Sequence, residues 1–187
     1  QLIVENGLRV PAGEGELLDF FADRLKVQQR EAGVRHDLID AVFALGAEDD
    51  LVRLLARVNA LQGFVETAEG ADLLAGYKRA SNILKKEKWE SEKRDSRVRG
   101  NDDLAREERV LLDALDAAEP TAAAAIEAED FTGAMAALAS LRGPIDAFFE
   151  HVTVNDPDPA KRARRLDLLL RFRDAVHRVA DFSKIEG

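Results

Sequence analysis

Positive charge is concentrated in one short segment of the sequence, GYKRASNILKK, at residues 76–86. Its basic side chains and the amide between them are Lys78, Arg79, Asn82, Lys85 and Lys86. Lysine and arginine bind phosphate oxygens, and an asparagine amide can read a base edge or a 2′-hydroxyl. The formal net charge of the whole chain is −9, so this segment stands out against an acidic background. Two interpretations stay open from the spacing alone: a solvated helix face, or a surface that meets a nucleic-acid backbone.

A second basic patch follows the turn sequence NDPDP, near the end of the chain. It consists of Lys161, Arg162, Arg164 and Arg165. Asp158 and Pro159 are typical of a helix start, so these cations would occupy the first turns of a helix, where they oppose the helix dipole. Local helix physics does not favour them there. We therefore include Arg162, Arg164 and Arg165 among the candidate nucleic-acid contacts.

The two patches lie in regions whose charge differs in sign from that of the segment between them. Residues 71–101 hold 9 Lys or Arg against 5 Asp or Glu, and residues 161–187 hold 8 against 4. Residues 102–160 hold 3 against 14. Because salt screens exposed charges over about 10 Å, a local basic patch can bind an anion despite the negative total.

Catalytic and metal-binding patterns are missing from the sequence. The three histidines, His36, His151 and His177, are far apart, and there is no cysteine. There is also no glycine-rich phosphate loop and no nucleophile elbow, and the carboxylates fall on polar faces. We interpret His36 with Asp37 as a helix start. The sequence therefore nominates no catalytic residue, metal ligand or cofactor site.

Hydrophobic periodicity predicts an all-α protein, a bundle of about eight to ten helices with no substantial sheet. Leu54, Leu138 and Leu169 lie on predicted apolar stripes, as does Tyr77, which makes it a core residue. Glycines 33 and 46 should end helices, Asp130 should cap one, and Pro120 and Pro144 should each start one. The chain opens without an initiator Met and inside an apolar pattern, so we expect a piece of a longer polypeptide, with the helical pattern beginning at residue 16. Residues 88–102 have no periodicity and are predicted to be an exposed, mobile insertion loop.

No apolar run reaches the roughly 20 residues that a membrane span needs, and no signal segment opens the chain. Together with the absence of cysteine, this favours a cytoplasmic protein without a membrane partner.

Four sequence blocks, in order, resemble one known family. They are LLDFFADRLKVQQREAGVRHDLIDAVFAL (17–45), YKRASNILKK (77–86), FFEHVTVN (148–155) and RRLDLLLRFRDAVHRVADFSKI (164–185). The resemblance is to the C-terminal region of the β subunit of bacterial two-subunit glycyl-tRNA synthetase. It covers nearly the whole chain. It implies that residues 16–187 form a helical anticodon-binding domain, similar to that of arginyl-tRNA synthetase, and that residues 1–15 are the tail of the preceding region.

The resemblance also implies a function and partners. The domain would bind the anticodon arm of tRNA-Gly, rather than DNA, as a non-catalytic part of an α2β2 ligase. ATP and magnesium are expected in the α subunit, which activates glycine. The alternative function is a helical scaffold or subunit-docking domain without RNA contact. The segment EKWESEKRDSRVRGNDD departs from the family pattern and looks like an acquired insertion, which argues against an RNA role for Trp89, Lys93, Arg94, Arg97 and Arg99.

Overall fold

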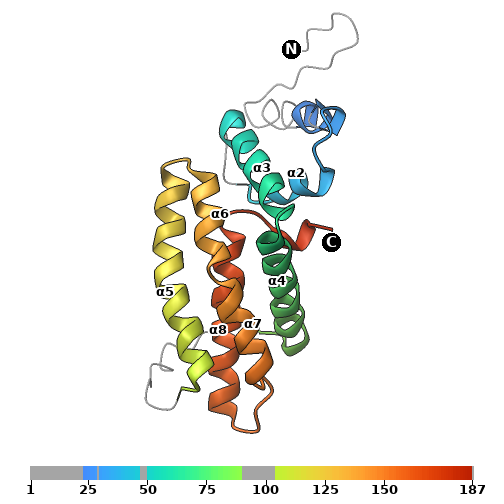
Figure 1. Cartoon of the computed structure of the whole chain (residues 1–187). Coiled ribbons are helices and arrows are strands. Elements are labelled where there is room, and N and C mark those ends of the chain that lie inside the picture. Colours follow the sequence, from blue (N-terminus) through green and yellow to red (C-terminus); the bar gives the residue numbers. More distant parts are fainter. Residues whose placement is uncertain (1–22, 29, 47–49, 90–103, 187) are drawn as a thin grey trace, which may run out of the picture.

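The computed structural model describes residues 23–28, 30–46, 50–89 and 104–186 (Figure 1). The helices with defined bounds are α2 (His36–Phe43), α3 (Leu51–Val65), α4 (Ala68–Glu87), α5 (Arg106–Glu127), α6 (Phe131–Ala139), α7 (Arg142–His151), α8 (Pro159–His177) and the short 3-10 helix η3 (Phe182–Lys184). The described residues contain no strand, which confirms the all-α prediction. Their seven bounded α-helices are fewer than the eight to ten expected.

Four helices form the main bundle. Helix α4 packs on α7 and α8, and α5 packs on the same two helices from the other side. Helix α6 follows α5 and leads into α7, and it also contacts α3. Helices α2 and α3 cap one end of the bundle, and the C-terminal segment returns to lie between α2 and α4 (Figure 1). In the view of Figure 1, α4 forms one edge of the bundle, and no described helix lies on the side of α4 that faces away from α7 and α8.

Most helix starts are fixed by an acidic or hydroxyl side chain. Asp130 accepts a hydrogen bond from the backbone N–H of Gly133 at the start of α6, at 2.8 Å. Asp158 accepts from the N–H of Ala160 at 2.9 Å, and Pro159 occupies the first turn of α8. Both predicted caps are confirmed. They satisfy N–H groups that have no partner within the helix.

The prediction of a helix start at Pro120 is wrong, because α5 runs without interruption from Arg106 to Glu127. Proline lacks an N–H and normally breaks a helix interior. Here both Pro120 and Asp116, whose carbonyl loses its partner, are exposed to solvent. The Thr121 hydroxyl donates to the carbonyl of Ala117, at 2.8 Å. Helix α7 likewise begins at Arg142, before Pro144, which lies in the first turn where no N–H partner is needed.

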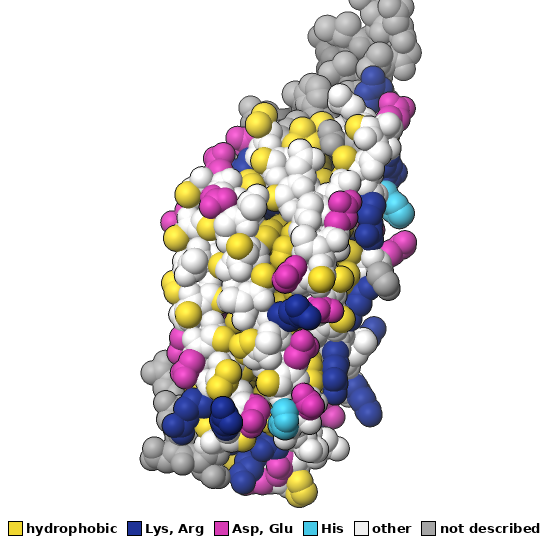
Figure 2. Space-filling view, viewed as in Figure 1, with side chains coloured by type: hydrophobic (Ala, Val, Ile, Leu, Met, Phe, Trp, Pro, Cys, Tyr) yellow, Lys and Arg dark blue, Asp and Glu magenta, His cyan; other side chains and the backbone are white. Residues whose placement is uncertain are grey.

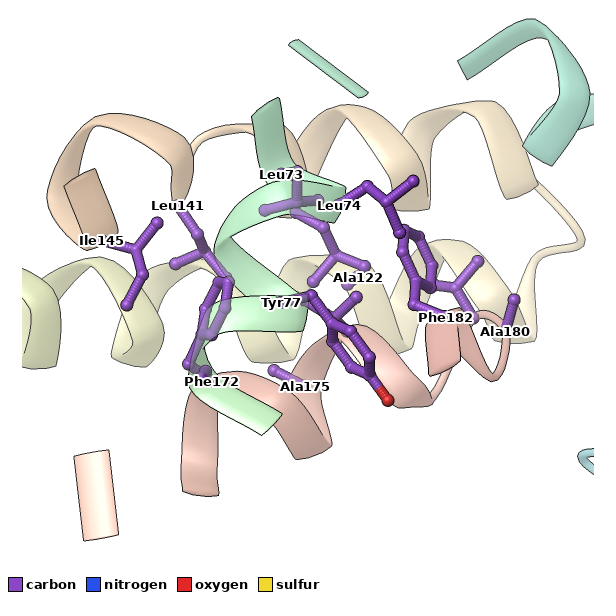
Figure 3. Packing of buried hydrophobic residues seen from close by; sticks show 14 of the residues in the cluster. Leu73, Leu74, Tyr77, Ala122, Leu141, Ile145, Phe172, Ala175, Ala180 and Phe182 are labelled. Carbon is purple, nitrogen blue, oxygen red and sulfur yellow. The ribbon is translucent and has the colours of Figure 1, made fainter. Parts of the chain in front are cut away.

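The core runs through the four-helix bundle and continues under α2, α3 and α6. The predicted stripe residues Leu54, Leu138 and Leu169 are buried. Tyr77 is also in the core, and its ring lies 5.6 Å from that of Phe182, between α8 and η3 (Figure 3). These observations confirm the predicted core. They also fix the rotation of α4 about its axis, because its buried stripe faces the bundle.

The C-terminal segment is tied to α2 by several hydrogen bonds. The backbone N–H of Asp181 donates to the carbonyl of Ala41 at 2.8 Å, and that of Glu186 donates to the Asp37 carboxylate at 2.8 Å. Arg35 donates to the same carboxylate and to the carbonyl of Glu186. Burial raises the pKa of Asp37, but these donors outweigh it and hold the pKa below its ordinary value. We call residues 180–186 the C-terminal strap.

Lys88 and Trp89, the first residues of the predicted insertion loop, follow the end of α4 at Glu87. Trp89 is half-buried and packs against the core, and its indole N–H donates to the carboxylate of Asp167 at 2.9 Å. An aromatic ring at this position buries enough apolar surface to hold the chain. The predictions for residues 1–22 and 90–102 lie outside the described residues.

Candidate nucleic-acid interface

The α4 basic face consists of Lys78, Arg79, Asn82, Lys85 and Lys86. All five side chains lie away from the buried stripe of α4, which comprises Leu73, Leu74, Tyr77, Ala80 and Leu84. Lys78 is half-buried, and the other four residues are exposed. Lysine and arginine side chains gather along the side of the molecule where α4 lies (Figure 2). The helix therefore separates apolar and basic residues onto opposite sides.

The three lysines of this face are not neutralised by nearby acids. Lys78, Lys85 and Lys86 have no ion-pair partner among the residues that the structure describes. Lys85 and Lys86 occupy the last turn of α4, where a positive charge is favoured by the helix dipole. Their charge is thus compatible with the local helix and remains available to an external anion.

Arg79 is held in place by a neighbouring helix. Its guanidinium lies 4.2 Å from the centre of the Phe149 ring, and it donates a long hydrogen bond of 3.4 Å to the carbonyl of Phe149. Stacking on an aromatic face is a preferred arrangement for a guanidinium. Arg79 consequently presents a fixed planar donor beside the mobile lysines.

The predicted basic patch at the start of α8 is arranged differently. Arg165 donates to Glu108 at 3.0 Å and to Asp156 at 2.6 Å, and Arg164 lies 3.3 Å from Glu108. The side chain of Glu108 is 0% exposed, and that of Arg165 is 10% exposed. Arg162 forms an ion pair with Glu87 at the end of α4. These arginines join α8 to the other elements of the bundle.

Hydrogen bonds also shift the pKa of Asp156. The backbone N–H of Asp158 donates to its carboxylate, and Arg165 donates to it as well. In that order, the two interactions lower the pKa of Asp156 below its ordinary value. The Arg165 guanidinium also donates to the carbonyl of Thr153 at 2.7 Å. The loop before α8 is therefore organised around one arginine.

Sequence reasoning missed the acidic partners of these arginines. Glu108 lies 57 residues from Arg165, and Glu87 lies 75 residues from Arg162. A similar long-range pair joins Arg171 to Glu119 at 2.8 Å. The only available signal was the amphipathic phase of α5, which places Glu108 and Leu111 on one side of the helix, but it does not identify the partner.

Other kinds of site are not found in the described part of the chain. No group of three or more histidine or acidic side chains could hold a metal ion there. Among the same residues, no helix is both long enough and apolar enough to cross a membrane. The α4 basic face is the surface whose chemistry points to a ligand.

The amino-acid sequence of this helical bundle matches the model of a known protein family. The model of the DALR anticodon binding domain matches residues 73–185, more than half of the chain. The chain therefore belongs to the DALR anticodon binding domain family. The matched range begins in α4, at the first buried leucine of its stripe, and ends just after η3.

The whole chain is also similar to the C-terminal part of glycine–tRNA ligase beta subunits from several bacteria. It is 56% identical to the glycine–tRNA ligase beta subunit of Rhodospirillum centenum, covering 100% of this chain and 29% of that protein. It is 50% identical to the same subunit of Phenylobacterium zucineum, covering 100% of this chain and 28% of that protein. The chain thus spans less than a third of the length of these relatives.

Proposed function

We propose that this chain is the tRNA-binding module of a glycine–tRNA ligase β subunit, and that its α4 basic face contacts the anticodon arm of tRNA-Gly. The observation that carries the proposal is the row of unneutralised lysines on a domain of the anticodon-binding family. The identity of 44–56% to ligase β subunits over the full chain supports the same assignment.

Each type of side chain on the α4 basic face would have a distinct role. Lys78, Lys85 and Lys86 act as point charges on phosphates and set affinity and salt dependence. Arg79, fixed against Phe149, offers a planar pair of donors to one phosphate. Asn82 lies among these cations and can hydrogen-bond a base edge or a 2′-hydroxyl, which would distinguish RNA from DNA.

The ligase chemistry would take place elsewhere. The described residues hold no group of metal ligands, and the sequence nominates no acid–base pair. As the family resemblance implies, glycine activation with ATP and magnesium would belong to the α subunit of a cytoplasmic α2β2 enzyme. In this arrangement, the chain contributes the binding energy that orients tRNA-Gly.

The proposal is tested by removing charge from the α4 basic face. The variant Lys78→Ala/Lys85→Ala/Lys86→Ala should bind a tRNA-Gly transcript more weakly, with a log–log salt slope shallower by about 2 to 3, because each lost phosphate contact removes about 0.7–0.9. The readout is fluorescence anisotropy at several salt concentrations. A matched control with the same charge loss is Arg106→Ala/Arg178→Ala/Lys184→Ala, which changes three exposed cations that are not part of the α4 basic face.

Two results would separate this proposal from its alternative. The control variant should keep most of the wild-type affinity and slope, and both variants should keep the helical circular dichroism spectrum. If the α4 variant binds tRNA-Gly as the wild type does, the domain is a scaffold or subunit-docking bundle. In that case, the exposed acids Asp113, Glu127 and Glu129 on and just after α5 would be the surface to test for protein contacts.

A further inference from the structure

A pocket of about 340 Å³ lies between the end of α4 and helix α8. It is lined by Ser81, Leu84, Lys85, Lys88, Trp89 and Arg173. Three of the six residues are cations, and one is the only tryptophan in the chain. Cations beside an aromatic ring are the combination that single-stranded nucleic-acid sites use.

Lys88 is held in an unusual backbone conformation at the pocket wall. Its φ of 50° and ψ of 43° are left-handed, a conformation that glycine normally supplies at a helix end. The N–H of Lys88 donates to the carbonyl of Lys85 at 3.2 Å, and that of Trp89 donates to the carbonyl of Leu84 at 2.9 Å. These bonds satisfy the carbonyls of Leu84 and Lys85 in the last turn of α4, and a lysine occupies the position where glycine would cost less.

The other walls of the pocket are fixed by hydrogen bonds. The indole N–H of Trp89 donates to Asp167 of α8 at 2.9 Å, which holds the half-buried ring against the bundle. Arg173 donates to Asp174 through both Nε and a terminal nitrogen, at 3.1 and 2.7 Å. Asp167 and Asp174 are thus each held by a donor from the pocket wall. Lys85 and Lys88 supply positive charge next to the ring.

We propose that this pocket receives one nucleotide of the bound RNA. Its phosphate meets Lys85 and Lys88, and its base lies against the exposed part of the Trp89 ring. This inference rests on the proposed function, because Lys85 belongs both to the α4 basic face and to the pocket. The pocket then continues the path of the phosphate backbone from α4 toward α8, with Arg173 at its far side.

The single tryptophan provides a direct readout. The anticodon stem-loop of tRNA-Gly should quench the fluorescence of Trp89 in the 187-residue chain, since a stacked base lies against the indole. A nucleoside 5′-monophosphate should compete at high concentration, whereas the nucleoside or inorganic phosphate alone should compete less. Quenching that follows the binding curve measured by anisotropy would place RNA at this pocket.

The variant Lys88→Gly removes the charge without endangering the fold. Glycine adopts the left-handed conformation more readily than lysine, so the melting temperature should stay level or rise. Affinity for the stem-loop should fall roughly two- to tenfold, with a salt slope shallower by about one phosphate contact. Trp89→Leu keeps an apolar contact but cannot stack, and it should lower affinity about fivefold or more. The matched control Lys86→Ala should weaken binding while leaving the quenching amplitude at saturation unchanged.

The outcomes distinguish the pocket from the larger proposal. If the stem-loop binds through the α4 lysines but neither quenches Trp89 nor responds to Lys88→Gly, the pocket proposal is overturned and the proposed function stands. If the wild-type chain binds no stem-loop at all, both proposals fail together. Binding with quenching, and sensitivity to both pocket variants, supports the pocket.

Discussion

The α4 basic face and the basic start of α8 look alike in the sequence and differ in the folded molecule. The α4 residues span about two and a half helical turns, and the α8 residues span about one and a half. On α4, the lysines have no acidic partner among the described residues. At the start of α8, Arg162 is paired with Glu87, and Arg165 is paired with Glu108 and Asp156. Similar charge density thus gives lysines that no described acid neutralises on α4 and a set of ion pairs between helices at the start of α8. We call the ion pairs of Arg162 and Arg165 the α8 brace.

The difference follows from the position of each helix in the bundle. Helix α8 contacts both α4 and α5, so cations on several of its sides meet acids from other elements. The basic side of α4 lies opposite its buried stripe and meets solvent. Arginine also suits the α8 brace, because its planar fork can hold several acceptors at once. For this reason the proposed RNA interface includes the α4 residues and leaves Arg164 and Arg165 to the interior.

The largest effect is expected from Arg165→Ala. Removing this guanidinium leaves the buried Glu108 with the Ala105 N–H at 2.8 Å and one charged partner, Arg164 at 3.3 Å. Breaking a buried ion pair typically costs about 3–5 kcal/mol, so urea denaturation should show a loss of about 3 kcal/mol in the free energy of unfolding. Lys86→Ala, the control on α4, should change it by less than about 0.5 kcal/mol. A small stability loss with a large loss of tRNA affinity would assign Arg165 to the interface instead.

A smaller effect concerns the acid sensitivity of the α8 brace. The pKa of Asp156 is below its ordinary value of 3.8, so the folded state favours the carboxylate. The stability that this carboxylate contributes is present above about pH 4 and is lost as the pH falls through the lowered pKa. Asp156→Asn should therefore be less stable than the wild type at neutral pH and should lose stability less steeply below about pH 4.

Urea midpoints measured across the acid range would test this expectation, with the exposed Asp113→Asn variant as the control. Parallel wild-type and Asp156→Asn curves would show that the carboxylate contributes nothing to the α8 brace.

The smallest effect is expected from a change that frees one arginine of α8 from its acidic partner and so makes this region more like α4. Glu87→Gln removes the acid that neutralises Arg162, whose side chain is 41% exposed. A released arginine near the end of α4 should raise tRNA affinity by about two- to fivefold at low salt, because one exposed charge contact contributes up to about 1 kcal/mol. The gain should vanish in Glu87→Gln/Arg162→Ala. A gain that survives in the double variant would mean that Arg162 is not its source.

The sequence predicted the fold class and much of the core, because hydrophobic period and caps are local signals. Leu54, Leu138 and Leu169 are buried as predicted, and Asp130 and Asp158 cap their helices. Pro120 misled the prediction because a proline is tolerated within a helix when the lost carbonyl partner falls on the solvent side. The pairing of Arg165 could not be predicted, because it depends on which helices become neighbours.

The residues that line the pocket between α4 and α8 could not be predicted from the sequence either, because they also depend on which helices become neighbours. Lys88 and Trp89 fall in a segment without periodicity, which predicts an exposed loop. Their positions depend on a helix-ending motif and on Asp167, 78 residues further along the chain. Local pattern identified the cations of α4 but not the tryptophan beside them.

The C-terminal strap has a consequence for the order in which the protein is made. Leu38, Ile39 and Val42 of α2 are completely covered in the folded chain. Part of that cover is the strap, whose bonds to Asp37 span 149 residues. At about 5–20 residues per second, a ribosome reaches the strap roughly 7 to 30 s after it has completed α2. For that interval the apolar side of α2 lacks its final partner on the nascent chain, so α2 can complete its packing only after the strap has been made.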